Sequence, residues 1–284
     1  MKPMCSSWSP WRLPALLLAC ALLALPALAE LMLNPTRVVF AKNQRAAQVE
    51  LINNSVEAAT YRITIVNRRM SEAGEFINAT EAGPGEQFAD AMLSWSPRQV
   101  TLQPGTAQVV RLMVRKPDAL ADGEYRSHLH FEKLASAADL ASSVEQRPAG
   151  EANIGVVLKT LVGASIPVIV RHGATDAAVT LSGGALQPAG PSQVPVLAFV
   201  LERSGNSSVY GDVSVTLTTR AGKAYELARA GGLAVYTPNP VRRAALALQV
   251  PSGVVLGGGQ LRLAYRERPE AGARLLAEAT LALP

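Results

Sequence analysis

The sequence predicts an all-β protein, and three observations carry that prediction. Apolar and polar residues alternate with a period of two in many short segments, among them 61–65, 110–114, 213–217, 246–250 and 261–265, as in strands with one buried face. Clusters of Gly, Asn, Asp and Pro separate these segments, as turns do. No segment combines a strong 3.6-residue period with a cap at each end, so we expect no long helix.

Residues 1–29 have the pattern of a secretory signal peptide. Lys2 and Arg12 are basic, residues 13–25 are apolar, and Ala27-Leu28-Ala29 is typical of a cleavage site. The apolar run is shorter than the ~20 residues that span a bilayer. A lipid-anchored export signal modified at Cys20 is the alternative. It is disfavoured because the apolar run continues through Cys20.

Removal of this leader changes the composition. The remaining 255 residues contain no cysteine, and the loss of two basic residues lowers the net charge from +5 to +3. An exported chain without cysteine cannot rely on disulfides. No basic stripe of the kind that binds nucleic acid is visible. The high apolar and low charged content excludes a disordered chain.

The strand spacing predicts two domains. Residues 30–171 and 175–284 each contain about seven candidate strands, the number in an immunoglobulin-like sandwich of ~100 residues. The sequence Arg171-His172-Gly173 marks a boundary, which gives domains over 30–172 and 173–284. In the first, Asp122-Gly123-Glu124-Tyr125 is typical of a tyrosine corner, in which the Tyr hydroxyl returns to nearby backbone.

Candidate catalytic residues are few. His128 and His130 lie two apart on an expected strand and so share one face, as two metal ligands would. No cysteine remains to complete a zinc site, which favours two polar residues on a solvated face. Phosphate-binding, dinucleotide-binding and nucleophile-elbow motifs are absent from the sequence. We therefore expect no enzyme, cofactor, metal or small-molecule substrate.

Two consecutive segments favour binding of another protein. Residues 132–152 predict a long loop, and long loops are usually functional or disordered. In the segment that follows, one face of an extended strand is formed by Ile154, Val156, Leu158, Thr160 and Val162. A core strand is one interpretation. The other is an apolar edge left open for pairing with another chain, because proteins normally avoid such exposed edges.

The order of motifs resembles the periplasmic chaperones of chaperone–usher pilus assembly over most of the 255 residues. The matching segments, in chain order, are 34–40, 49–54, 96–97, 102–105 with 110–112, 122–127, 169–171, 205–210 and 235–238. The resemblance implies two sandwich domains set at an angle, like a boomerang. It also implies donor-strand complementation, a form of β-augmentation in which the chaperone lends a strand to an incomplete pilus subunit.

The resemblance further implies the partners of this chain, and two other functional hypotheses compete with it. The partners would be pilus subunits and an outer-membrane usher, with no nucleic acid, and an exposed donor strand also invites self-association of the free chain. A structural pilus component or adhesin is the alternative, but a disulfide or an N-terminal donor extension would be expected of it. An exported metal hydrolase using His128 and His130 is a third hypothesis.

The resemblance also assigns site residues. Arg37 matches the first of two cleft cations that anchor the subunit's terminal carboxylate, and its guanidinium fork suits that task. Pro167 stands where the family has the second, a lysine, and Lys159 lies about 26 Å away along an extended strand. Either another cation serves, or the sequence resembles a divergent branch with different anchoring, which we favour. Glu124 and Arg171 match two members of an interdomain ion pair, for which the second domain offers no convincing third acid. The donor strand is the 154–162 segment.

Overall fold

The computed structural model describes residues 30–136, 163–187 and 194–284 of the chain. The expected signal peptide 1–29, with Cys20, lies outside the described residues. So do most of the expected loop and all five expected donor-strand residues, Ile154, Val156, Leu158, Thr160 and Val162. The all-β fold class is confirmed by the strands and the two short 3₁₀ turns of the described part.

The first sandwich comprises two facing sheets. One has the strand order β1-β3-β9-β7 and the other β2-β11-β10-β4-β8, and all pairs are antiparallel except β2 with β11. The strands are β1 (Leu31–Asn34), β2 (Val38–Phe40), β3 (Ala46–Asn53), β4 (Ala59–Val66), β7 (Leu93–Ser96), β8 (Gln99–Leu102), β9 (Ala107–Val114), β10 (Gly123–Lys133) and β11 (Ala164–His172); the 3₁₀ turn η1 (Asp90–Met92) precedes β7.

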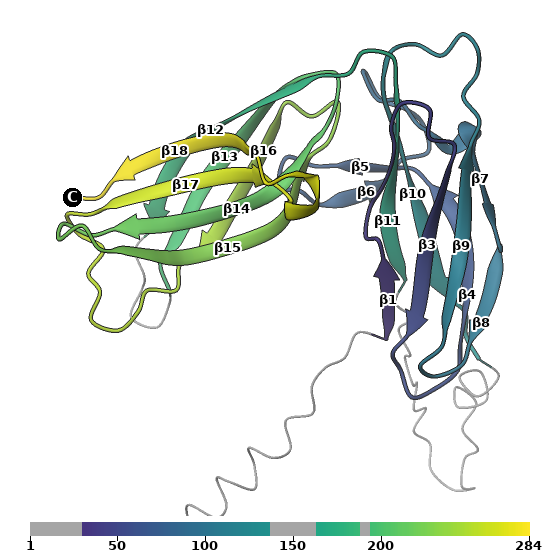
Figure 1. Ribbon diagram of the computed structural model, residues 1–284, viewed down its shortest axis with the longest axis horizontal. Coiled ribbons are helices and arrows are strands. Elements are labelled where there is room, and N and C mark those ends of the chain that lie inside the picture. Colours follow the sequence, from purple (N-terminus) through teal and green to yellow (C-terminus); the bar gives the residue numbers. More distant parts are fainter. Residues whose placement is uncertain (1–29, 137–162, 188–193) are drawn as a thin grey trace, which may run out of the picture.

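The second sandwich is entirely antiparallel. Its sheets have the orders β12-β13-β16 and β15-β14-β17-β18. The elements are β12 (Ala177–Gln187), β13 (Val196–Gly205), β14 (Val209–Thr218), β15 (Ala224–Val235), β16 (Val241–Ala247), β17 (Gln260–Glu267), η2 (Pro269–Ala271) and β18 (Leu275–Ala282). Figure 1 shows the second set of strands running across the direction of the first, so that the two sandwiches meet at an angle.

Each sandwich has its own hydrophobic core. The first contains Phe40, Leu51 and Phe131, and the second Phe199 and Tyr265, all essentially without exposed surface. The alternation in the sequence explains this arrangement, because every second residue of a strand faces inward. Burial of each large apolar side chain contributes about 1.5–3 kcal/mol.

A small hairpin stands apart from both sandwiches. Its strands are β5 (Arg68–Met70) and β6 (Phe76–Asn78), which among the described strands pair only with each other. Figure 1 places the hairpin between the two sandwiches. Met70 of this hairpin packs with Ile169 of the first sandwich and with Ala234 and Tyr236 of the second in a small third core.

Most of the expected strands are present, with one correction. The segment Leu246–Val250 was expected to be one strand, but β16 ends at Ala247. The chain leaves the sheet there: the amide of Leu248 donates to Pro195 O and the next amide, that of Gln249, donates to Leu227 O. The side chain of Leu248 lies in the core with no exposed surface. This buried position accounts for the apolar–polar alternation that continues past the end of β16.

The tyrosine corner has the expected geometry. The hydroxyl of Tyr125 donates to the carbonyl oxygen of Ala121, four residues upstream, at 3.0 Å. This bond fixes the turn that precedes β10, the strand that carries several of the charged residues described below.

Candidate functional site

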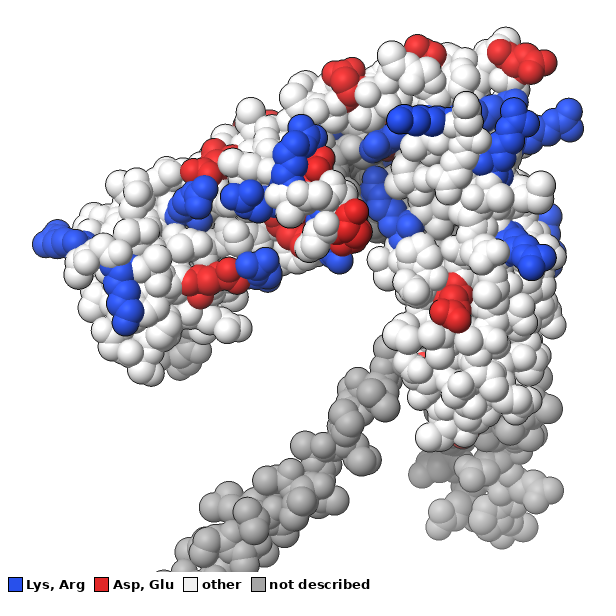
Figure 2. Space-filling model, in the orientation of Figure 1, with Lys and Arg blue, Asp and Glu red and all other residues white. Residues whose placement is uncertain are grey.

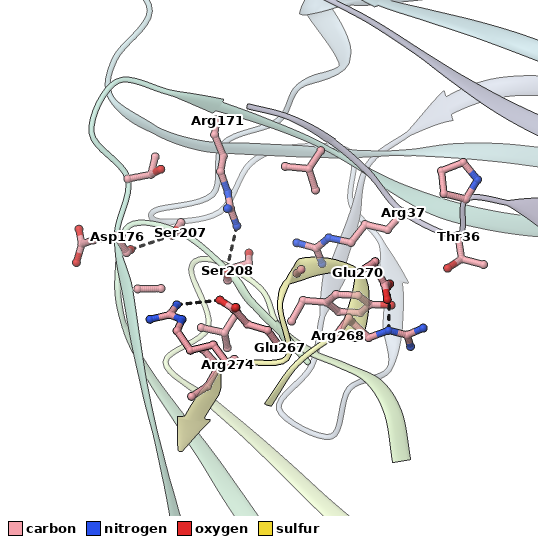
Figure 3. A pocket seen from close by; sticks show the side chains of 18 residues that line it. Thr36, Arg37, Arg171, Asp176, Ser207, Ser208, Glu267, Arg268, Glu270 and Arg274 are labelled. Atoms are coloured by element: carbon pink, nitrogen blue, oxygen red, sulfur yellow. Dashed lines mark hydrogen bonds and ion pairs between the residues drawn. The ribbon is translucent and has the colours of Figure 1, made fainter. Parts of the chain in front are cut away.

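A cavity of about 700 Å³ lies between the two sandwiches. The first sandwich contributes Arg37 and Arg171 to its lining, and the second contributes Ser208, Tyr210 and Arg268 among others. Figure 3 shows Arg37 and Arg171 of the first sandwich converging with Ser208 and Arg268 of the second. In Figure 2 basic and acidic side chains gather around this junction, whereas the far end of the first sandwich is mostly uncharged.

Arg37 reaches this cleft from the short connection between β1 and β2 and contacts two tyrosines of the second sandwich. Its guanidinium carbon lies 4.5 Å from the centre of the Tyr210 ring and 5.3 Å from that of Tyr236. Its Nη1 donates to the hydroxyl of Tyr236 at 3.3 Å. The two rings therefore fix the direction of the guanidinium group by cation–π contact and a hydrogen bond.

The other arginines that line the cavity have acidic partners. Arg274 donates to Glu267 at 2.8 Å, and Arg268 lies 3.2 Å from Glu270. Arg268 also lies 3.4 Å from Asp212, whose charge is the main cause of its raised pKa, with Glu270 adding to it. The hydrogen bond to Glu267 raises the pKa of Arg274. Arg171 is paired with Glu124. Among the described residues, Arg37 is therefore the cleft cation that is free to take an incoming anion.

Glu124 and Arg171 of the first sandwich bind each other and Ser208 of the second, and so link the two sandwiches. Arg171 Nε donates to Glu124 Oε2 at 3.0 Å, and the Glu124 side chain has no exposed surface. Ser208 of the second sandwich donates to both carboxylate oxygens, through its hydroxyl and its main-chain amide. Its carbonyl oxygen accepts a bond of 3.1 Å from Arg171. A serine thus stands where the sequence analysis sought a third acid.

A second set of polar residues lies buried at the junction, on the face of β10 that is turned away from the core. Arg126 is 6% exposed and His128 2% exposed. The guanidinium carbon of Arg126 lies 4.4 Å from the centre of the Tyr236 ring. The ring of Phe76 from the hairpin meets that of His128 edge-on at 5.1 Å. Burial, together with the charges of Arg126 and Arg68, lowers the pKa of His128 to about 3.

The two histidines do not lie on a solvated face, so that expectation is wrong for His128. The hairpin and Tyr236 cover this side of β10, and both ring nitrogens of His128 are buried with no hydrogen-bond partner in the part of the chain that the structure describes. His130 is partly buried, and its Nδ1 lies 3.0 Å from the carbonyl oxygen of Ala164. Within the described residues, no cluster of three or more His, Cys, Asp or Glu could hold a metal ion.

The structure also places Pro167, which stands where the resemblance implies a second cation. Pro167 of β11 lies opposite His128 of β10, and Arg126 lies opposite Ile169. Arg126 is therefore the diagonal neighbour of Pro167 on the same face of the sheet. Arg126 thus places a buried cation of β10 on this part of the face.

The sequence analysis did not find Arg126, Tyr210 or Tyr236. The sequence contains one indication for Arg126. A charged residue between two apolar strand positions lies either on a face exposed to solvent or on a face covered at a junction. Tyr210 and Tyr236 lie about 170–200 residues from Arg37 in the chain. Their contact with Arg37 depends on how the two sandwiches dock, which the local pattern does not contain.

Comparison with known proteins gives structural neighbours only. No family model matches the sequence, and no curated protein matches it. Solved structures that are similar include the YadV chaperone, with 11% identity and a TM-score of 0.43 over 90% of this chain and all of that one. The Pseudomonas aeruginosa CupB2 chaperone has 13% identity and a TM-score of 0.41, over 89% of this chain and 100% of the other.

A further neighbour is a complex. It is the CsuC–CsuE chaperone–tip subunit pre-assembly complex from the archaic chaperone–usher Csu pili of Acinetobacter baumannii, with 12% identity, a TM-score of 0.44, and coverage of 90% of this chain and 98% of the other. Chaperones of chaperone–usher pili, the class that the sequence resembles, are thus among the solved structures similar to this chain. No helix among the described residues is long and apolar enough to cross a membrane.

Proposed function

We propose that this chain is a periplasmic chaperone that binds pilus subunits and delivers them to an outer-membrane usher. The observation that carries the proposal is Arg37, an arginine in the interdomain cleft that has no acidic partner among the described residues. A guanidinium group binds a carboxylate through two parallel hydrogen bonds, so Arg37 suits the terminal carboxylate of a subunit.

The proposal includes the division of the chain. Residues 1–29 direct export to the periplasm and are removed, residues 30–172 form the subunit-binding domain, and residues 173–284 form the second domain. Glu124 and Arg171, joined through Ser208, hold the two domains at the angle that forms the cleft.

Donor-strand complementation is the proposed mode of binding. The side chains that would fill the groove of the subunit are Ile154, Val156, Leu158, Thr160 and Val162. Strand β11, which follows them in the chain, supports this role: β2 pairs only with its residues 168–170, so within the described part residues 164–167 leave one edge open. Each large aliphatic side chain buried in the subunit would contribute about 1.5–3 kcal/mol.

The test is co-expression of the tagged chain with each member of a panel of pilus subunits, followed by purification through the tag. We expect the unmodified chain to recover a subunit, and Arg37→Gln to fold normally but to recover at least about tenfold less, because it loses a charge-assisted pair. Arg98→Gln is the matched control. Arg98 also stacks on an aromatic ring, that of Trp95 at 3.5 Å, but it does not line the cleft.

Equal recovery by Arg37→Gln and the unmodified chain would reject the anchoring role of Arg37. Failure of the unmodified chain to recover any of these subunits would reject the chaperone function itself.

A further inference from the structure

Basic side chains gather at one end of the first sandwich, where β3 begins and β9 ends. This basic patch consists of Lys42, Arg45, Arg111, Arg115 and Lys116. The first two belong to the connection between β2 and β3, the third to β9, and the last two follow β9 directly. All are exposed except Lys116, which is partly buried. Figure 2 shows basic side chains over this end of the sandwich.

Hydrogen bonds to main-chain groups hold these segments together. The amide of Val114 donates to the carbonyl oxygen of Arg45 at 2.9 Å. The ammonium group of Lys116 donates to the carbonyl oxygen of Lys42 at 3.1 Å and to that of Arg171 at 2.6 Å. Burial, and after it the charge of Arg45, lower the pKa of Lys116. The cations therefore lie close enough for their charges to add.

The charge of the basic patch is not neutralised by ion pairs. Within the described residues, none of its members lies within 4 Å of a carboxylate, and Glu50 on the adjoining part of β3 forms no ion pair either. In the second sandwich, by contrast, Arg262, Arg268 and Arg274 all have acidic partners. A surface with one sign of charge attracts a partner of the opposite sign.

An exposed methionine lies among these cations. Arg111 and Met113 are two residues apart on β9, so they project from the same face of the sheet, and Arg115 follows two residues later. Met113 is 60% exposed, and its cross-strand neighbours Ala46 and Ser94 are small and exposed too. An apolar side chain flanked by long cations is typical of surfaces that enter the interface of a lipid bilayer.

An anionic bilayer matches the basic patch better than an acidic protein does. Protein interfaces concentrate their binding energy in a few side chains that fill pockets. The basic patch does not line the interdomain cavity, and its large apolar member is one flexible methionine. A bilayer needs no pocket, because its headgroups form a continuous plane of negative charge to which each nearby Lys or Arg adds attraction.

We propose that the basic patch docks this chain on an anionic phospholipid surface. Its guanidinium and ammonium groups bind the phosphates of the headgroups, and Met113 enters the boundary between headgroups and acyl chains. The inference does not depend on the capture of a pilus subunit, because the residues involved do not line the cleft. Binding is reversible, since a few cations and one apolar side chain supply far less affinity than an inserted helix.

The test is co-sedimentation of the purified full chain with lipid vesicles. Phosphatidylglycerol mixed with phosphatidylethanolamine forms the anionic vesicles, and phosphatidylcholine forms the neutral ones. We expect the chain to sediment with the anionic vesicles only. Addition of salt to about 1 M should release it, because the range of electrostatic attraction then falls to about 3 Å.

Two double variants locate the binding surface. Arg111→Gln with Arg115→Gln should weaken binding to anionic vesicles about 25-fold, since each cation near the surface contributes about fivefold. Arg220→Gln with Arg266→Gln is the matched control. It removes two exposed cations of the second sandwich and should leave binding nearly unchanged. All four side chains are exposed, so both variants should keep the thermal midpoint of the unmodified chain.

Met113→Trp measures entry into the bilayer. Its fluorescence should shift to shorter wavelength with anionic vesicles and stay unchanged with neutral ones, because indole rings settle at the headgroup level when the chain docks. Unchanged emission from a variant that sediments with anionic vesicles would reject the role of Met113.

Three results would overturn the proposal as a whole. Equal losses of binding in the two double variants would show that the net charge of the chain, and not the basic patch, attracts lipid. Equal sedimentation with anionic and neutral vesicles, or with neither, would reject recognition of anionic headgroups. Binding of polyglutamate that the patch variant loses, without any binding to vesicles, would assign the surface to an acidic polypeptide instead.

Discussion

Arg37 illustrates how a single side chain of one sandwich depends on the other. Its guanidinium group is held by the rings of Tyr210 and Tyr236, both from the second sandwich. Neither ring carries a negative charge that would neutralise the cation. The contacts therefore orient Arg37 and leave its charge available, which is the property that a preorganised carboxylate site requires.

His128 leads to a prediction about pH. Its folded pKa of about 3 lies below the ordinary 6.5 because of burial and the facing charges of Arg126 and Arg68. As the pH falls through 6.5 the unfolded chain takes up a proton that the folded chain refuses until about pH 3, so acid destabilises the fold. Between pH 7 and pH 5 this group costs about 2 kcal/mol.

His128→Leu should remove that part of the pH dependence. Urea denaturation of both proteins at pH 7 and pH 5 measures it as the difference between their losses of unfolding free energy. Identical losses in the two proteins would show that His128 titrates normally in the folded state.

At the scale of the residue, the sequence indicated some of this site and not the rest. Arg37, Glu124 and Arg171 could be named from the sequence because they match positions of the family that the sequence resembles. The role of Ser208 was not, because it bonds through its backbone and hydroxyl, and almost any turn contains such groups. His128 was interpreted as a residue of a solvated face and Arg126 was not singled out, since alternation does not reveal what covers that face.

At the scale of the element, the β5–β6 hairpin joins the two sandwiches. Asn239 of the second sandwich donates to the carbonyl oxygen of Met70 at 2.6 Å. The amide of Arg243 donates to the carbonyl oxygen of Glu72 at 2.7 Å, and the side chains of these two residues form an exposed ion pair at 3.2 Å. The hairpin thus covers the face of β10 that carries the buried polar residues.

The contacts of the hairpin with Asn239 and with Arg243 contribute different amounts to the free energy of unfolding. Asn239→Ala should lower the free energy of unfolding by about 0.5–1.5 kcal/mol, because it removes a partly buried hydrogen bond, and should speed amide exchange in the hairpin. Arg243→Ala should change stability by less than about 0.5 kcal/mol, since its exposed ion pair is screened by water. Denaturant titration with hydrogen exchange of residues 68–78 makes the comparison. Equal effects of the two changes would contradict this ranking.

The hairpin was not predicted from the sequence. Its strands are three residues each, and Arg68, Arg69 and Asn78 give no period-two signal. The long strands β9 and β14 were predicted because apolar and polar residues alternate within them, over 110–114 and 213–217. Short elements gain their stability from tertiary contacts, such as Phe76 with His128 and Tyr236, which no local window contains.

At the scale of the whole molecule, the cleft exists because two independent cores are held at an angle. The Glu124–Arg171–Ser208 link lies on one side of the junction, and the hairpin contacts the second sandwich through Asn239 and Arg243. The all-β class and the number of sandwiches followed from the alternation and the turn spacing. The angle did not, because it depends on these few contacts between residues far apart in the chain.

The central claim is that this chain captures a pilus subunit by lending it a strand and holding its terminal carboxylate. Hydrogen–deuterium exchange of the free chain and of its purified complex with the subunit tests the claim most directly. We expect slower amide exchange at residues 153–162 and around Arg37 in the complex, and unchanged exchange in β18. Exchange at 153–162 that is the same in both samples would contradict donor-strand complementation.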